Sequence, residues 1–224
     1  MRNKLFTSLV TGFCMAGISS VASATAISIT NGSGAVNYVI GYSDTLPYTL
    51  TGNHNNDSVL YLWDEVQNFT LTADLFVDRV ADAGASYVGG TPGDYYISAG
   101  TIVSSHYVQW DPLVTTGVQA TLNFDSDIFA FITSDNNLFA SDYLGHPSID
   151  YGNFTLRGLE SGDTTAFNSG SVDIDWAASS PGDWTRLITA YSPGGVPVPE
   201  PATMFLFTAG LLGLAGFRLK KKKM

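Results

Sequence analysis

The sequence predicts an all-β fold: an antiparallel, jelly-roll-like β-sandwich ectodomain, with an N-terminal signal peptide and a single C-terminal transmembrane helix. Three observations predict the ectodomain. Helix-favouring Glu, Lys, Gln and Arg are scarce between residues 25 and 191, whereas the turn-forming residues Asp, Asn, Gly, Ser and Thr are abundant. Short stretches alternate apolar and polar residues with a period of two, as half-buried strands do. Turn residues separate these stretches at short intervals, which is typical of sandwiches.

Residues 1–24 have the pattern of a secretory signal peptide. Arg2 and Lys4 form a positive n-region, an apolar h-region follows, and Ala22 and Ala24 supply the small residues of a cleavage site. This pattern implies the Sec translocon and signal peptidase as partners during export. The protein is therefore expected to be exported.

Residues 25–191 are expected to form one ectodomain. Nine stretches in it have strand patterns: residues 26–30, 35–43, 68–80, 97–103, 105–110, 120–124, 127–133, 172–176 and 185–191. The longest alternation, residues 68–80, predicts a single half-buried strand. Residues 127–133 are apolar on both faces, which predicts a central strand. Residues 89–94 predict a loop, and residues 138–144 predict a short helix.

Charge is distributed unevenly along the chain. All five lysines lie at positions 4 and 220–223, and residues 25–197 hold three arginines against 19 acids, which leaves a formal charge of −16. This balance argues against nucleic acid as a partner, because phosphate binding needs clustered Lys or Arg. It also argues against binding to anionic lipid. The only cysteine, Cys14, lies inside the signal peptide, so the mature domain has neither a thiol nor a disulfide.

The C-terminal segment, residues 198–224, follows a linker over residues 192–197. A Pro-Glu-Pro motif comes first, then the uncharged apolar run 202–217, then a basic cluster. The 16 residues of this run would form a helix of about 24 Å, shorter than the ~30 Å hydrocarbon core of a bilayer. Five cations would hold the end of this helix on the cytoplasmic side: Arg218, Lys220, Lys221, Lys222 and Lys223.

This order of features resembles the PEP-CTERM sorting signal of Gram-negative envelope proteins. In that family a membrane cysteine peptidase, the exosortase, cleaves near the Pro-Glu-Pro motif. The resemblance implies that an exosortase recognises Val198, Pro199, Glu200 and Pro201. It also implies that the exported chain is tethered to the inner membrane through its helix before processing and then reaches the cell surface or the medium. An ordinary C-terminal anchor after a proline linker is the alternative.

The ectodomain also resembles a recurrent secreted ectodomain of unknown activity. Segments that carry this resemblance include Ser105-His106-Tyr107, Arg157-Gly158-Leu159-Glu160 and Pro181-Gly182-Asp183. It implies no activity.

Calcium is the ion that the oxygen-rich composition suits best, and no other cofactor is expected. Asp125 with Asp127, and Asp173 with Asp175, each place two carboxylates on one face of an extended segment. The alternative is that these are solvated turn acids. The three histidines have no local metal-binding motif: His54, His106 and His146.

No catalytic residue is predicted, and the expected role is that of a non-enzymatic surface or extracellular-matrix protein associated with exopolysaccharide. A carbohydrate-binding module, with or without calcium, is one alternative, and it would present Trp and Tyr in a shallow exposed row. A glycoside hydrolase is another, and it would need a concave site with two close carboxyls and one shifted pKa. The tryptophans that sugar stacking would use are Trp63, Trp110, Trp176 and Trp184.

Overall fold

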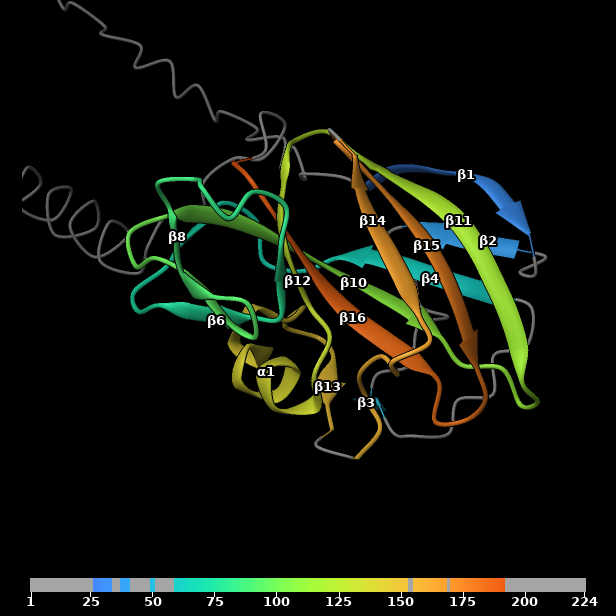
Figure 1. The fold of residues 1–224 in the computed structure, drawn as a ribbon. Helices are drawn as coiled ribbons and strands as arrows, with labels where there is room; N and C mark the ends of the chain where they lie inside the picture. The colour runs from blue at the N-terminus through green and yellow to red at the C-terminus, as the bar shows by residue number, and fades with distance from the viewer. Residues whose placement is uncertain are drawn as a thin grey trace, which may run out of the picture.

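The computed structural model describes residues 26–33, 37–40, 49–50, 59–152, 155–168 and 170–191 (Figure 1). This part of the chain is built almost entirely of β-strands, most of them antiparallel, which confirms the prediction of an all-β fold. The predicted signal peptide, linker, sorting motif and C-terminal helix lie outside the described residues. Within those residues, no helix is both long enough and apolar enough to cross a membrane.

Two sheets make up most of the domain. The outer sheet has the order β1 (Ala26–Ser33), β11 (Thr116–Phe124), β15 (Ser171–Ala178) and β14 (Thr164–Asn168). The central sheet has the order β2 (Asn37–Ile40), β4 (Val59–Asp64), β10 (Ile102–Trp110), β16 (Asp183–Thr189), β12 (Ile128–Ile132) and β7 (Arg79–Val80). A short strand, β5 (Phe69–Thr70), also pairs with β10. The neighbours β2 and β4 are parallel, and the other pairs in these two sheets are antiparallel.

The smaller elements cover one side of the central sheet. A three-stranded sheet has the order β6 (Leu75–Val77), β9 (Asp94–Ile97) and β8 (Val88–Thr91). The other elements are the parallel pair β3 (Thr49–Leu50) and β13 (Asp150–Tyr151), the helix α1 (Asp135–Ala140) and the 3-10 helix η1 (Asp142–Leu144).

The outer sheet packs face to face on the central sheet, and the two share a hydrophobic core (Figure 1). Burial alternates strictly along β15, so one face of the outer sheet is apolar and the other carries exposed acids. The apolar face supplies Val172 and Trp176, and the central sheet supplies Val108 and Leu187 to the same core. The domain is therefore a β-sandwich in which the outer sheet is half-exposed.

The middle strands of the central sheet, β10 and β16, are buried on both faces. Every residue of β16 is buried, and so is every residue of β10 after the first. A second core lies on the face away from the outer sheet, where Trp63 and Ile188 pack with Leu138 of α1 and Ile97 of β9. In a strand that is covered on both faces, every polar side chain contacts other protein groups instead of water. The charged residues of β16 are therefore buried.

Residues 68–80 do not form the single strand that their alternation predicts. They form β5, β6 and β7, which pair with three different partners: β10, β9 and β12. Asn68 has a φ of 52°, and the carboxylate of Asp74 accepts a hydrogen bond from the backbone N–H of Ala99, so the chain turns away from β10 here. The alternation correctly predicts the burial of Leu71, Leu75 and Val77, whereas Ala73, which it places on the same face, is exposed.

Two shorter predictions also differ from the structure. The predicted loop at residues 89–94 lies within a hairpin, because β8 and β9 pair on either side of a turn in which Gly93 has a φ of 91°. The predicted helix at residues 138–144 is divided into α1, which begins three residues earlier, and η1. The prediction of a central strand at residues 127–133 is confirmed by β12.

Candidate metal centre

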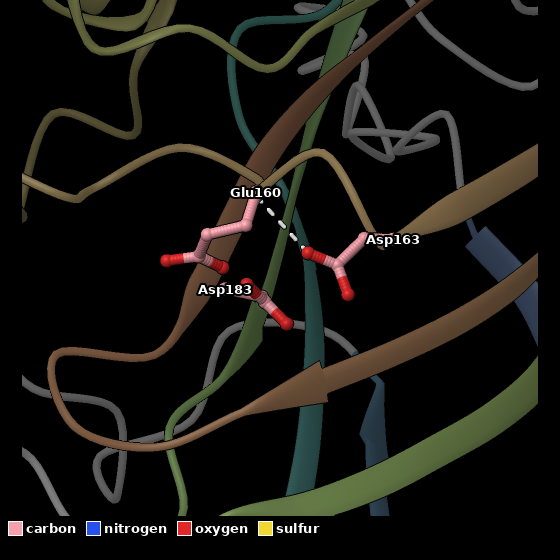
Figure 2. Close-up of side chains that lie close together, drawn as sticks. All are labelled: Glu160, Asp163 and Asp183. Atoms are coloured by element: carbon pink, nitrogen blue, oxygen red, sulfur yellow. Dashed lines mark hydrogen bonds between the residues drawn. The ribbon is translucent and has the colours of Figure 1, made fainter.

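Three carboxylates converge at one end of the sandwich, and we call them the acid cluster: Glu160, Asp163 and Asp183. One oxygen of each lies within 4.8 Å of an oxygen of the other two. Figure 2 shows that Glu160 and Asp163 approach from the loop before β14, whereas Asp183 approaches from the first position of β16. The cluster therefore joins a segment that leads into the outer sheet to a strand of the central sheet.

A tight turn holds Glu160 and Asp163. The backbone N–H of Asp163 donates to the carbonyl of Glu160 (3.2 Å), and the N–H of Glu160 donates to the Asp163 carboxylate (3.0 Å). The other Asp163 oxygen accepts a hydrogen bond from the N–H of Ala177 in β15 (2.9 Å). Both oxygens of Asp163 are thus oriented by backbone donors, and each retains acceptor capacity.

The segment before this turn is anchored to the start of α1. The Asp135 carboxylate accepts hydrogen bonds from the N–H groups of Leu156 (2.9 Å) and Gly158 (2.8 Å), and Leu159 donates to the carbonyl of Thr133. A Cβ atom on Gly158 would lie 1.9 Å from that same carbonyl, so only glycine fits. This close approach fixes where the chain reaches Glu160.

Asp183 is positioned by the turn that precedes it. Gly182 has a φ of 82° and donates to the carbonyl of Ser179 (2.7 Å). A Cβ atom on Gly182 would lie 2.6 Å from Asp111, so glycine is needed both for its backbone angle and for space. Asp183 then pairs in register with Trp110 of β10, which sets its side chain on the face of the central sheet that meets the outer sheet.

Asp183 is the unusual member of the cluster. Its side chain is fully buried, and neither carboxylate oxygen has a hydrogen-bond partner in the described part of the protein. Burial raises the pKa of Asp183 to about 9, and the adjoining carboxyls of Glu160 and Asp163 act in the same direction. No ion pair within the described residues includes a member of the cluster. The arrangement attracts positive charge, and the described residues supply none to it.

An open groove of about 430 Å³ lies beside the cluster. Its lining includes Glu160, Asp163, Asp175 and Trp176, but it does not include Asp183. A second hollow of about 310 Å³, lined by Asp135 and Leu159, shares Glu160 with the groove. Glu160 is exposed and stands between the two, so the cluster is open to solvent on its Glu160 side and closed on its Asp183 side.

A second group of buried charges lies on the opposite face of the central sheet, and we call it the arginine cluster: Arg157, Arg186, Glu65 and Asp142. Arg186 donates to both oxygens of Glu65 (2.6 and 2.9 Å), and Arg157 donates to both oxygens of Asp142 (2.8 and 2.7 Å). Both guanidinium groups lie over the ring of Tyr107 at 5.5 and 5.1 Å. Two cations face two anions, so this group is neutral without a ligand.

The acids predicted as calcium ligands occupy other places. Asp173 and Asp175 lie on the exposed face of β15, where they accept hydrogen bonds from Thr121 (2.6 Å) and Gln119 (3.0 Å). Asp125 and Asp127 lie in the turn between β11 and β12. The structure gathers no three of these four acids into a metal-ligand group; the acid cluster is the group found in the described part of the chain.

The histidines and tryptophans lie mostly in the interior. His106 is buried between Asp64 (2.7 Å) and Thr189 (3.1 Å), whereas His146 is partly exposed and His54 falls outside the described residues. All four tryptophans are buried in the two cores, so the exposed row that a Trp-based sugar site would need is not formed by Trp63, Trp110, Trp176 or Trp184.

Residues 197–222 match the family model of the PEP-CTERM protein-sorting motif. The chain carries a PEP-CTERM sorting motif. The match includes Val198, Pro199, Glu200 and Pro201, together with the apolar run and most of the basic cluster. No curated protein and no solved structure matches the chain. The PEP-CTERM motif implies an exosortase as the processing partner, export, and membrane-anchored sorting before cleavage.

Sequence reasoning found the PEP-CTERM motif but missed the acid cluster. Glu160 and Asp183 are 23 positions apart in the sequence, and Glu160 lies in none of the expected strands. Two local signals were available: Glu160-Ser-Gly-Asp163 has the form of a turn, and Pro181-Gly182 directly precedes Asp183. Neither signal says that the two turns meet. Only the pairing of β16 in the central sheet brings them together.

Proposed function

We propose that this PEP-CTERM protein is a non-enzymatic surface or extracellular-matrix protein that an exosortase processes after export and that associates with exopolysaccharide. The observation that carries the proposal is the sorting motif at residues 197–222. A domain with a formal charge of −16 over residues 25–197 and no cysteine is suited to a solvated, oxidising environment outside the cell. In this proposal the sorting motif directs the domain to the cell surface, where the domain has a structural role in the matrix.

The geometry of the acid cluster supports a non-enzymatic role over glycoside hydrolysis. A glycosidase needs two carboxyls that both reach the substrate. Glu160 and Asp163 line the groove, but Asp183, the member of the cluster whose raised pKa would suit a general acid, is fully buried and does not line it. The raised pKa of Asp183, which burial and the neighbouring carboxyls produce, therefore belongs to a group that a sugar in the groove would not touch.

The sorting step is tested by the mass of the mature protein. Intact mass spectrometry of the protein from the producing bacterium is compared with that from a strain without exosortase. We expect loss of the residues after the Pro-Glu-Pro motif in the first strain and their retention in the second. A variant with Pro199, Glu200 and Pro201 replaced by alanine should also retain them, whereas Pro193→Ala in the linker, outside the matched motif, should be processed normally. Retention of Lys220–Lys223 in both strains would refute the proposal.

The association with exopolysaccharide is tested separately. We expect the mature protein to co-sediment with polysaccharide extracted from the cell surface, and to be released into the medium by a strain that makes no polysaccharide. A catalytically inactive exosortase provides the control, because the uncleaved protein should then remain with the membrane fraction in both strains. Equal release from the polysaccharide-producing and polysaccharide-free strains would contradict the association.

A second candidate function is the binding of a glycan chain in the groove beside the acid cluster. The groove of about 430 Å³ is lined by hydrogen-bonding side chains, among them Thr115, Thr164 and Ser179, as well as the acids. This would be recognition by polar groups, because the tryptophans are buried. A glycan-binding screen of the full-length protein and of a Thr164→Lys variant tests it. Binding that Thr164→Lys leaves unchanged would place any glycan elsewhere.

A further inference from the structure

We propose that Glu160, Asp163 and Asp183 bind one Ca²⁺ ion, which links the outer sheet to the central sheet. The first reason is the unmatched charge. Asp183 is fully buried, and no donor in the described residues reaches either of its oxygens. A buried carboxylate without a partner is unfavourable by several kcal/mol, so native proteins pair such groups or use them to coordinate metals. The other two members of the cluster are also acids and can supply no proton donor when ionised.

The second reason is distance. The ligand oxygens of the three residues lie within 4.8 Å of one another. Oxygen ligands lie about 2.4 Å from Ca²⁺, so two oxygens on opposite sides of the ion are about 4.8 Å apart. Mg²⁺ holds its ligands at about 2.1 Å and requires near-ideal octahedral geometry, whereas Ca²⁺ tolerates irregular coordination. The three oxygens therefore lie close enough to share one ion, and Ca²⁺ is the ion that suits an irregular set of two acids from a turn and one from a strand.

The third reason is that the ligands are already oriented. Backbone donors hold both Asp163 oxygens, and β-sheet pairing holds Asp183, so neither side chain would lose much conformational freedom on binding. Glu160 is exposed and completes the cluster from the solvent side (Figure 2). Calcium takes six to eight oxygens, and water reaching the open side through the groove would complete the shell.

The position of the ion defines its role. Asp163 leads into β14 of the outer sheet and is hydrogen-bonded to β15, whereas Asp183 begins β16 of the central sheet. An ion between them would bridge the two sheets where the shared core ends. Binding to the folded state alone stabilises that state in proportion to the logarithm of the free Ca²⁺ concentration. The domain would therefore be more stable outside the cell, where Ca²⁺ is abundant, than before export.

The test measures Ca²⁺ binding and thermal unfolding of the full-length protein in mild detergent, after removal of metal with a chelator. We expect one equivalent of Ca²⁺ to bind and to raise the midpoint of unfolding, with a much smaller response to Mg²⁺. Terbium provides an independent readout, because Trp176 lines the adjoining groove and should sensitise the emission of a bound Tb³⁺, which Ca²⁺ then displaces. Absence of Ca²⁺ binding, or an equal response to Mg²⁺, would overturn the assignment.

Two variants distinguish this site from general attraction to an acidic surface. Asp183→Asn should lower the Ca²⁺ affinity at least about tenfold, since calcium affinity follows the number of charged ligands. Glu160→Gln should do the same without any risk to folding, because Glu160 is exposed. The matched control is the double variant Asp127→Asn with Asp173→Asn, which removes two exposed acids outside the groove and should leave binding unchanged. A loss in the control equal to that in Glu160→Gln would refute the site.

Discussion

Strand β16 carries a buried charge on each face, and the two are neutralised in different ways. Arg186 points into the core beneath α1, where it meets Glu65 and a second ion pair formed by Arg157 and Asp142. Asp183, three positions earlier, points toward the outer sheet and meets Glu160 and Asp163. The first group contains equal numbers of both signs, whereas the second contains carboxylates alone.

The difference indicates where this protein depends on its surroundings. The arginine cluster is complete within the chain: Arg186 also donates to Ser141 and to the carbonyl of Leu138, so its guanidinium is fully hydrogen-bonded. Although burial opposes the charge of Arg186, the carboxylate of Glu65 raises its pKa overall. The acid cluster is complete only with a proton or a cation from solution. One group stabilises the fold under all ordinary conditions, and the other does so conditionally.

The largest effect should come from breaking the arginine cluster. Arg186→Met would leave Glu65 buried without its bidentate partner, and removing one member of a buried ion pair destabilises a protein by about 3–5 kcal/mol. Urea unfolding followed by tryptophan fluorescence measures the change. If Arg186→Met does not fold, Arg186→Lys is informative, because it keeps the charge but loses the fork of donors that reaches Glu65, Ser141 and Asp142. A loss below ~1 kcal/mol in both variants would contradict a central role for the cluster.

The same substitution should have opposite effects in the two clusters. Asp142→Asn removes the charge that accepts two hydrogen bonds from Arg157 and one from Arg186, so the free energy of unfolding should fall by about 1–3 kcal/mol. Asp183→Asn replaces an unpartnered buried carboxyl by a neutral group of the same shape. In calcium-free buffer at neutral pH its free energy of unfolding should rise by about 1–3 kcal/mol.

Urea unfolding of both variants in the presence of a chelator provides the comparison. Added Ca²⁺ should then stabilise the wild type and the Asp142→Asn variant but not the Asp183→Asn variant. Destabilisation by Asp183→Asn in calcium-free buffer would mean that the Asp183 carboxyl has a partner and that the two clusters are alike in being self-sufficient.

The contrast between the clusters also explains how far the sequence could predict the structure. Alternation along β15 predicts its buried face correctly, because the period of a strand is a local property. The pairing of Arg186 with Glu65 could not be predicted, since 121 positions separate them and the sheet order alone brings β16 near the end of β4. For the same reason, exposed acids that repeat along one strand, such as Asp173 and Asp175, form a stronger pattern in the sequence than two turns that meet only in the fold.

Alkaline pH offers a narrower test of the arginine cluster. Burial raises the pKa of Tyr107 from 10.0 to about 12, partly offset by Arg157 and Arg186. The folded state therefore keeps a proton that the unfolded chain releases, so this contribution to stability is complete below pH 10 and is lost as pH rises toward 12. Tyr107→Phe should remove this contribution. Between pH 10 and 12 the free energy of unfolding of the variant should therefore fall less steeply than that of the wild type, by up to about 1.4 kcal/mol per pH unit.

At neutral pH Tyr107→Phe should itself be less stable by about 1–2 kcal/mol, because Arg157 loses the hydroxyl that accepts its Nε–H at 2.7 Å. Urea unfolding at pH 8 and at several values from 10 to 12 measures both effects. Tyr151 is a suitable control, since burial also raises its pKa well above the usual value. Tyr151→Phe should reduce the alkaline sensitivity without removing an acceptor from Arg157. An unchanged pH slope in both variants would show that the phenols do not titrate with unfolding.

The smallest effect is expected on the exposed face of the outer sheet. The Asp173 carboxylate accepts hydrogen bonds from Thr121 and Asn168, and that of Asp175 accepts one from Gln119, but both acids are solvated. Asp173→Asn and Asp175→Asn should therefore each change stability by less than about 0.5 kcal/mol. Added Ca²⁺ should also leave this difference unchanged. The measurement discriminates because the face carries the most regular acidic pattern in the sequence. If either variant lost the response to Ca²⁺, the cation would bind on the exposed face of β15 rather than at the junction of the two sheets. The two clusters on β16 would then no longer differ in their need for an external charge.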